Sequence, residues 1–156
     1  MQTQGQAPSP VASQNYRRIL VGYDGSENSE RALARAAALA AEHGASLSVI
    51  VVVNTVVMSI GPMASPIPEE VFDERIDYGK KTLSKAMKTV ETSVPSVTGA
   101  VEEGYPAEWI LNIAARDKVD LIVLGRRGIS AVERFLLGGV SSNVVAHSKC
   151  DVLIVK

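Results

Sequence analysis

Residues 19–33 read ILVGYDGSENSERAL, and the order of residue types in this stretch indicates the fold. The apolar run 17–23 predicts a strand, because branched aliphatic residues follow one another. Residues 24–26 (DGS) predict a turn and a helix start, since Asp and Ser side chains accept hydrogen bonds from free backbone amides. Alanine and leucine at helical spacing predict a helix over 27–43, and Gly44 is suited to end it in a left-handed conformation. A strand, turn and helix in this order predict an α/β domain.

The same alternation continues to the end of the sequence. Further strands are predicted at 45–53, 97–103, 119–124 and 151–155, and further helices from 69 to about 92, from 106 onward and from about 141 to 147. The second helix is expected to turn Ile76, Leu83, Met87 and Val90 inward. Strands that alternate with helices predict a mostly parallel sheet covered on both faces. The third strand is the most polar and is expected near an edge.

Length and composition restrict the class of protein. A chain of 156 residues fits one domain, with 1–14 expected to be a flexible tail and 15–156 the folded part. The tail lacks the basic and apolar regions of a signal peptide, and no apolar run reaches the roughly 18 residues of a membrane span. Sixteen basic residues against 17 acidic ones argue against a nucleic-acid or membrane surface partner. With Cys150 as the single cysteine, a cytoplasmic location is expected.

Residues 124–142, LGRRGISAVERFLLGGVSS, carry most of the chemistry. Gly125 ends a buried strand, Gly128 follows, and a glycine pair at 138–139 precedes Ser141 at a helix start. Glycines let backbone amides approach a ligand, and a helix start offers free N–H groups, so a phosphate cradle is one interpretation. The spacing is neither G-x-G-x-x-G nor a Walker A loop. On the glycines alone, plain turns and a helix start explain the stretch equally well.

The stretch resembles the nucleotide motif of the universal stress protein family, which is Gly, two residues, Gly, nine residues, Gly and Ser or Thr. Residues 19–33, 105–128 and 150–156 resemble the same family, so the likeness covers about 16–156. It implies a single doubly wound α/β domain of the adenine nucleotide alpha hydrolase-like type, with a five-stranded parallel sheet ordered 3-2-1-4-5. In that order the carboxyl ends of strands one and four are neighbours, at the switch point where such folds bind ligands.

The resemblance also implies a ligand, which is ATP, ADP or AMP. The nucleotide-binding residues that it implies are Gly22, Tyr23, Asp24, Val52, Leu124, Gly125, Arg127, Gly128, Gly138, Gly139, Val140 and Ser141. Gly22 and Tyr23 would line the pocket through backbone and ring, and Val52 would meet the adenine. Asp24 would contact the ribose or adenine side, or else only cap the first helix. Gly125 would lie under the ribose.

The remaining glycines, with Val140 and Ser141, would surround the phosphates, and Arg127 could pair with phosphate charge. One position departs from the family motif, because Gly139 stands where the motif has Ser or Thr. The lost hydroxyl predicts weaker phosphate binding, although the backbone amide remains.

The sequence offers no catalytic group beside this site. His43 and His147 have no evident partner, and no cluster has metal-ligand spacing. A Mg²⁺ or Mn²⁺ ion would be held by the phosphates. The expected protein is therefore not an enzyme beyond slow ATP hydrolysis. The resemblance implies an ATP-binding stress-response regulator or switch that acts through a nucleotide-dependent dimer.

Two alternatives use the same fold. One is a universal stress protein that binds no nucleotide and acts as a dimeric interaction scaffold, an interpretation that Gly139 favours. The other, a phospho-accepting receiver domain, needs an acidic pair after strand one, and Asp24 stands alone there. In either universal stress protein interpretation, the apolar last strand at a sheet edge predicts a two-fold homodimer.

Overall fold

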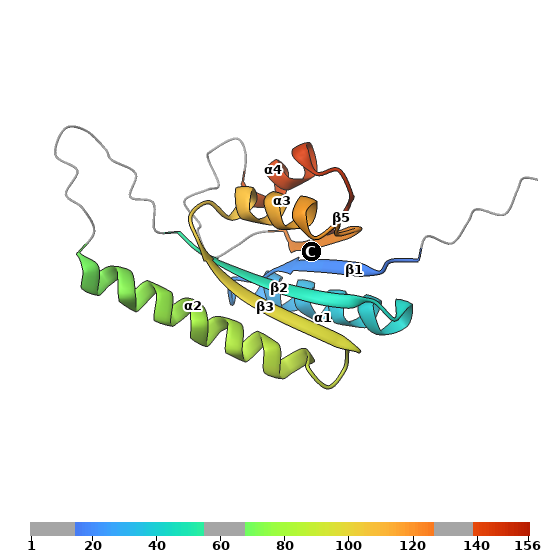
Figure 1. Cartoon of the computed structure of the whole chain (residues 1–156), viewed down its shortest axis with the longest axis horizontal. Helices are drawn as coiled ribbons and strands as arrows, with labels where there is room; N and C mark the ends of the chain where they lie inside the picture. The colour runs from blue at the N-terminus through green and yellow to red at the C-terminus, as the bar shows by residue number, and fades with distance from the viewer. Residues whose placement is uncertain (1–14, 55–67, 127–138) are drawn as a thin grey trace, which may run out of the picture.

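Five parallel strands in the order β3-β2-β1-β4-β5 form one sheet between two layers of helices (Figure 1). The computed structural model describes residues 15–54, 68–126 and 139–156. The elements are β1 (Arg18–Gly22), α1 (Glu27–His43), β2 (Ser46–Val53), α2 (Glu69–Val90), β3 (Ser96–Glu103), α3 (Pro106–Arg116), β4 (Leu121–Gly125), α4 (Val140–His147) and β5 (Asp151–Val155). The predicted α/β fold, with its strand order 3-2-1-4-5, is confirmed.

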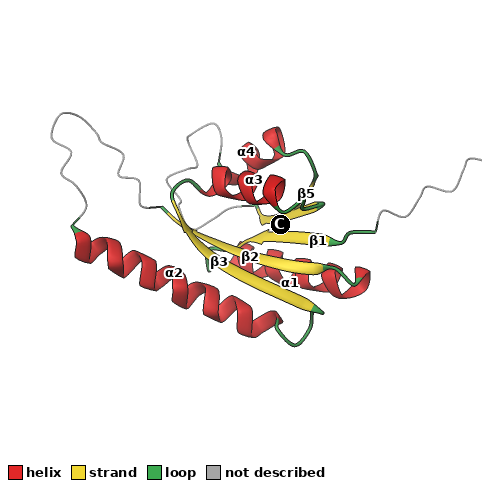
Figure 2. Cartoon of the chain, viewed as in Figure 1, coloured by secondary structure: helices red, strands yellow, loops and turns green. Residues whose placement is uncertain are grey.

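The two faces of the sheet carry separate cores. Helices α1 and α2 cover one face and α3 and α4 cover the other (Figure 2). In β1, Ile19 and Val21 pack with the α1/α2 core, whereas Leu20 packs with the α3/α4 core. All three are at most 1% exposed. Burial on both faces explains the continuous apolar runs 19–21 in β1, 49–53 in β2 and 121–124 in β4.

Helix α1 begins and ends on local signals. The Ser26 side chain accepts a hydrogen bond from the Ser29 amide at 3.2 Å, which makes Ser26 the N-cap. Gly44 follows the helix with φ at 63° and donates its N–H to the carbonyls of the last turn. Both signals are those expected from sequence, and the observed bounds equal the predicted ones.

Helix α2 lies unusually close to β2 and β3. A Cβ added to Gly79 would stand 2.6 Å from Val53 Cγ2 and 3.0 Å from Val101 Cγ1, so only glycine fits there. The buried positions of the helix are Gly79, Thr82, Ala86 and Val90. The predicted inward face is confirmed for Val90, which is buried, and for Leu83 and Met87, which are half-buried and pack against the α1/α2 core, whereas the burial of Gly79, Thr82 and Ala86 was not predicted.

The two edge strands differ in character. Strand β3 is polar and ends in Glu102 and Glu103, whereas β5 is apolar from 152 to 155. The first residue of β5, Asp151, accepts a hydrogen bond from the Tyr16 hydroxyl at 3.0 Å. The expectation that the third and last strands lie at the edges is confirmed.

Candidate functional site

The carboxyl ends of β1 and β4 lie side by side at the centre of the sheet. Val21 pairs with Val123 in parallel register, so the next residues on each strand, Gly22 and Leu124, are also neighbours. The chain leaves β1 into α1 on one face, whereas α4, which follows β4, covers the opposite face. This divergence forms the switch point at which open α/β sheets bind ligands.

Two glycines allow the elements around this point to approach each other. A Cβ on Gly22 would stand 2.6 Å from Leu124 Cδ2 and 3.2 Å from Ile110 Cδ1. A Cβ on Gly125 would stand 2.7 Å from both the carbonyl carbon and the oxygen of Asn28 in α1. Both glycines therefore have a packing role, and Gly125 lets the end of β4 pack directly against the first turn of α1.

The turn after β1 is fixed by its own hydrogen bonds. Gly25 has φ at 80°, a conformation that favours glycine. Asp24 Oδ1 accepts a hydrogen bond from the Ser26 amide at 2.9 Å, and the Asp24 amide donates to Ser29 Oγ at 3.3 Å. Asp24 therefore shapes the turn, whereas the helix cap itself is Ser26.

Tyr23 contributes its backbone and not its ring to this end of the sheet. The side chain is 4% exposed and lies in the α1/α2 core, while its amide donates to the Ile50 carbonyl at 2.9 Å. Burial raises the pKa of the Tyr23 hydroxyl, and the nearby Glu30 carboxylate raises it further. Glu30 in turn pairs with Lys85 of α2 at 2.7 Å. The expectation that the ring lines a pocket does not match this placement.

The start of α4 meets the chain where it leaves β4. The Ser141 hydroxyl donates to the Arg126 carbonyl at 3.5 Å, and the Arg126 amide donates to the Val155 carbonyl at 2.8 Å. Gly139 is the N-cap of α4, with φ at −54° and no side-chain cap. Among the described residues, no atom would lie within 4 Å of a Cβ added to Gly139, and its φ of −54° does not require glycine.

The remaining predicted residues are placed as follows. Val52 is half-buried at the end of β2 and packs against the α3/α4 core, in which Leu124 is 4% exposed. Val140 is the first residue of α4 and also packs against that core. Arg127, Gly128 and Gly138 lie outside the described residues. Gly22, Asp24, Gly125 and the start of α4 thus belong to one end of the sheet.

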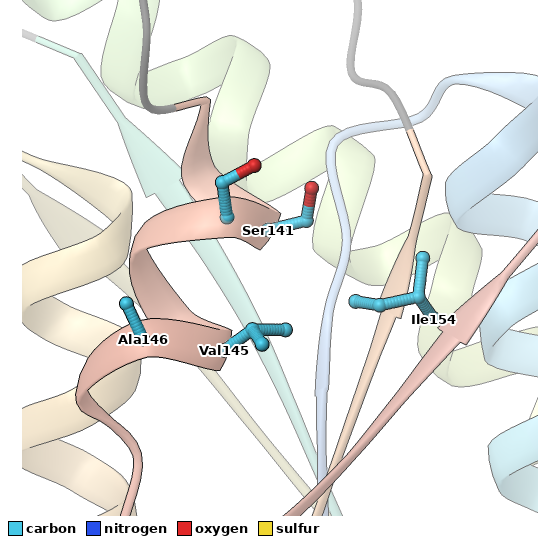
Figure 3. Close-up of a pocket in the computed structure, with 5 residues that line it drawn as sticks. Ser141, Val145, Ala146 and Ile154 are labelled. Carbon is cyan, nitrogen blue, oxygen red and sulfur yellow. The ribbon is translucent and has the colours of Figure 1, made fainter.

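A shallow hollow of about 380 Å³ lies between α4 and β5. Its lining residues are Ser141, Ser142, Val145, Ala146 and Ile154. Figure 3 shows Val145 of α4 pointing toward Ile154 of the edge strand. Val145 is 54% exposed and places an apolar surface beside Ile154. Sequence reasoning did not predict this hollow, because its walls come from two elements that meet only in the fold.

Within the residues that the structure describes, no group of three His, Cys, Asp or Glu side chains could hold a metal ion. His43 contacts Asn15 through Nδ1 at 2.8 Å, and His147 contacts the Asn143 carbonyl at 2.9 Å. Across the same described ranges, no helix combines the length and the apolar character that a membrane crossing requires.

Comparison with known proteins gives one consistent result. The sequence profile described as the universal stress protein family matches residues 15–156. A universal stress protein of Thermus aquaticus is 40% identical over 141 residues, which are 90% of this chain and 99% of the relative. A putative universal stress protein of Staphylococcus epidermidis is 34% identical over 145 residues, 91% of this chain and 85% of the relative.

Solved structures agree with the sequence relatives. The universal stress protein UspA of Lactobacillus plantarum has a TM-score of 0.80 and 29% identity, and the alignment covers 92% of this chain and all 100% of that one. A universal stress protein crystallised in complex with cAMP has a TM-score of 0.70 and 30% identity, with 92% of this chain and 99% of that chain covered.

Proposed function

Because the chain belongs to the universal stress protein family, we propose that it binds ATP or a related adenine nucleotide and acts as a stress-response regulator. The observation that carries the proposal is the meeting of three backbone segments at the switch point. Gly125 packs on α1, and the Ser141 hydroxyl reaches the Arg126 carbonyl, so the start of α4 faces the ends of β1 and β4. A helix start beside glycine-bearing backbone suits a phosphate group.

The similarity to a universal stress protein crystallised with cAMP supports an adenine nucleotide as the ligand class. In this proposal Asp24 and Gly125 contact the ribose side, Val52 meets the adenine, and Gly22 and the backbone of Tyr23 line the crevice. The residues assigned to the phosphates are Arg127, Gly128, Gly138, Gly139, Val140 and Ser141.

Gly139 lowers the expected affinity without removing the site. A hydroxyl that donates to a charged phosphate contributes about 1.5–3 kcal/mol, which corresponds to about one to two decades in Kd. No atom of the residues that the structure describes would lie within 4 Å of a Cβ at Gly139, which supports room for such a hydroxyl. The weaker phosphate binding that we expect therefore comes from the missing side chain of Gly139 and not from its backbone conformation.

We assign the protein a binding role and no enzymatic one beyond slow hydrolysis. Among the described residues near the end of β1, the Asp24 carboxylate is engaged in its turn and the Glu30 carboxylate pairs with Lys85. A Mg²⁺ or Mn²⁺ ion would be held by the nucleotide phosphates. We place the protein in the cytoplasm, without a nucleic-acid or membrane partner, as a homodimer paired through β5.

Calorimetry with ATP tests the nucleotide proposal. We expect saturable binding to the unmodified protein, and loss of binding in Gly128→Val and Gly138→Val. Gly44→Ala is the matched control, because Gly44 lies at the opposite end of α1 and its φ of 63° makes the substitution costly for stability alone. Unchanged ATP binding in both valine variants would rule out the proposed phosphate contacts.

A second candidate function is a dimeric scaffold that binds no nucleotide. Two observations favour it, which are the glycine at position 139 and the apolar hollow beside the β5 edge. Mass spectrometry of the denatured, freshly purified protein separates the two functions. Released adenine nucleotide supports the switch, whereas a dimer that releases none and does not bind added ATP supports the scaffold.

A further inference from the structure

The ends of β2 and β3 lie on the side of β1 opposite to β4. Val52 and Val53 of β2 pair with Glu102 and Glu103 of β3, and the Gly104 amide donates to the Val53 carbonyl at 2.9 Å. The chain then turns at once from β3 into α3 (Figure 1). The first turn of α3 is therefore tied to the strand end at which we place the adenine.

Trp109 lies in this first turn and is held in one orientation. Its indole Nε1 donates to the Glu103 carbonyl at 2.7 Å. Gly104 has φ at 129°, and a Cβ there would stand 3.3 Å from Nε1 and 3.7 Å from Cδ1 of the indole. The glycine thus permits both the sharp turn and the close approach of the ring. A ring fixed by a hydrogen bond loses little further freedom when a ligand contacts it.

The same ring lies on the face of the sheet to which Val52 points. Both side chains are half-buried, and both pack against the α3/α4 core. Half-burial leaves part of the indole surface available, next to the strand end that carries Val52. Ile110, the neighbour of Trp109 in α3, is buried in the α3/α4 core, where its Cδ1 would stand 3.2 Å from a Cβ at Gly22 of β1.

We infer that Trp109 is the base-contacting aromatic residue of the nucleotide site and makes it selective for purine bases. This inference rests on the proposed function. An aromatic side chain stacks on any base, and a two-ring purine covers more of an indole than a one-ring pyrimidine does. The phosphate contacts at the start of α4 are common to all nucleoside triphosphates. Trp109 therefore determines which base is preferred, because its ring contacts the base and not the phosphates.

Binding measurements on two variants test the inference. Calorimetry is carried out with ATP and with UTP on the unmodified protein, Trp109→Leu and Trp109→Phe. We expect Trp109→Leu to lose about tenfold or more in ATP affinity and much less in UTP affinity. Trp109→Phe keeps an aromatic face and should stay within about threefold of the unmodified protein. A merely structural role of Trp109 would change stability and leave the ATP to UTP ratio constant.

Tyr105→Leu is the control, because Tyr105 is an aromatic residue of the same turn that is 48% exposed and belongs to neither core. It should leave the ATP to UTP ratio unchanged. A change of the ratio in Tyr105→Leu but not in Trp109→Leu would overturn the assignment to Trp109.

Fluorescence gives a second readout that needs no variant, since Trp109 is the only tryptophan of the chain. We expect saturating ATP to change its emission. ATP binding by calorimetry without any change in emission, or equal loss of ATP and UTP affinity in Trp109→Leu, would overturn the inference and leave the proposed function standing. Failure of the unmodified protein to bind ATP would instead overturn the proposed function, and with it this inference.

Discussion

Gly125→Ala should destabilise the protein because the added methyl group would collide with the backbone of α1. The new Cβ would stand 2.7 Å from the carbonyl carbon and oxygen of Asn28, closer than Cβ atoms come to other atoms in real proteins. Overpacking of this kind costs about 1–3 kcal/mol. Since the obstructing atoms belong to a helix backbone and cannot rotate away, we expect a loss in the upper half of this range, about 2–3 kcal/mol.

Two further variants provide reference values for the stability loss of Gly125→Ala. In Gly22→Ala the closest atom is Leu124 Cδ2 at 2.6 Å, which is the end of a side chain and can move, so the loss should be smaller. In Gly139→Ala no atom of the described part of the chain lies within 4 Å of the new Cβ and φ is −54°, so stability should be unchanged or rise by up to about 1 kcal/mol.

Urea unfolding followed by far-ultraviolet circular dichroism measures all three variants. For a slope of about 2 kcal/mol per molar urea, Gly125→Ala should lower the midpoint by roughly 1 M. A midpoint of Gly125→Ala equal to that of Gly139→Ala would show that the end of β4 does not rest on α1 in the way described.

Three other predictions concern the cap, the site and the edge of the sheet. Ser26→Ala should cost about 0.5–2 kcal/mol in urea unfolding, because the Ser29 amide loses its acceptor, and an unchanged midpoint would contradict this. Gly139→Ser should raise ATP affinity in calorimetry about tenfold, and equal affinity would show that the missing hydroxyl is not what limits binding. Val145→Glu should give a monomer in light scattering at unchanged stability, because Val145 is 54% exposed; a persistent dimer would place the interface elsewhere.

Local signals made several elements predictable from the sequence. Ser26 and Gly44 cap the helix ends that lie next to them in the sequence, so α1 was predicted with its observed bounds. The last strand was also predicted with its observed bounds, because an apolar run follows a helix and ends the chain. The position of the candidate site followed from strand order, which came from the resemblance to a family and not from periodicity.

Other features depend on partners far away in the sequence. The large apolar residues on the inward face of α2 were predicted, but the close packing at Gly79 was not, because its partners Val53 and Val101 are far away in the sequence. The burial of the Tyr23 ring depends on its packing in the α1/α2 core, where Glu30 of α1 lies near its hydroxyl. Neither of these relations has a short-range sequence signal. The indole of Trp109, in contrast, is fixed by near neighbours in the sequence, the Glu103 carbonyl and the turn at Gly104.

The unlike edges of the sheet bear on how copies of the chain can add to one another. Head-to-tail addition would join β3 of one copy to β5 of the next, and each addition would leave the same two edges open, as in a growing filament. Pairing of β3 with the apolar β5 of another copy is disfavoured by Glu102 and Glu103 at the end of β3, because their carboxylates would lose hydration. When β5 of one copy pairs with β5 of another, the apolar edge of both copies is covered, so assembly stops at a dimer.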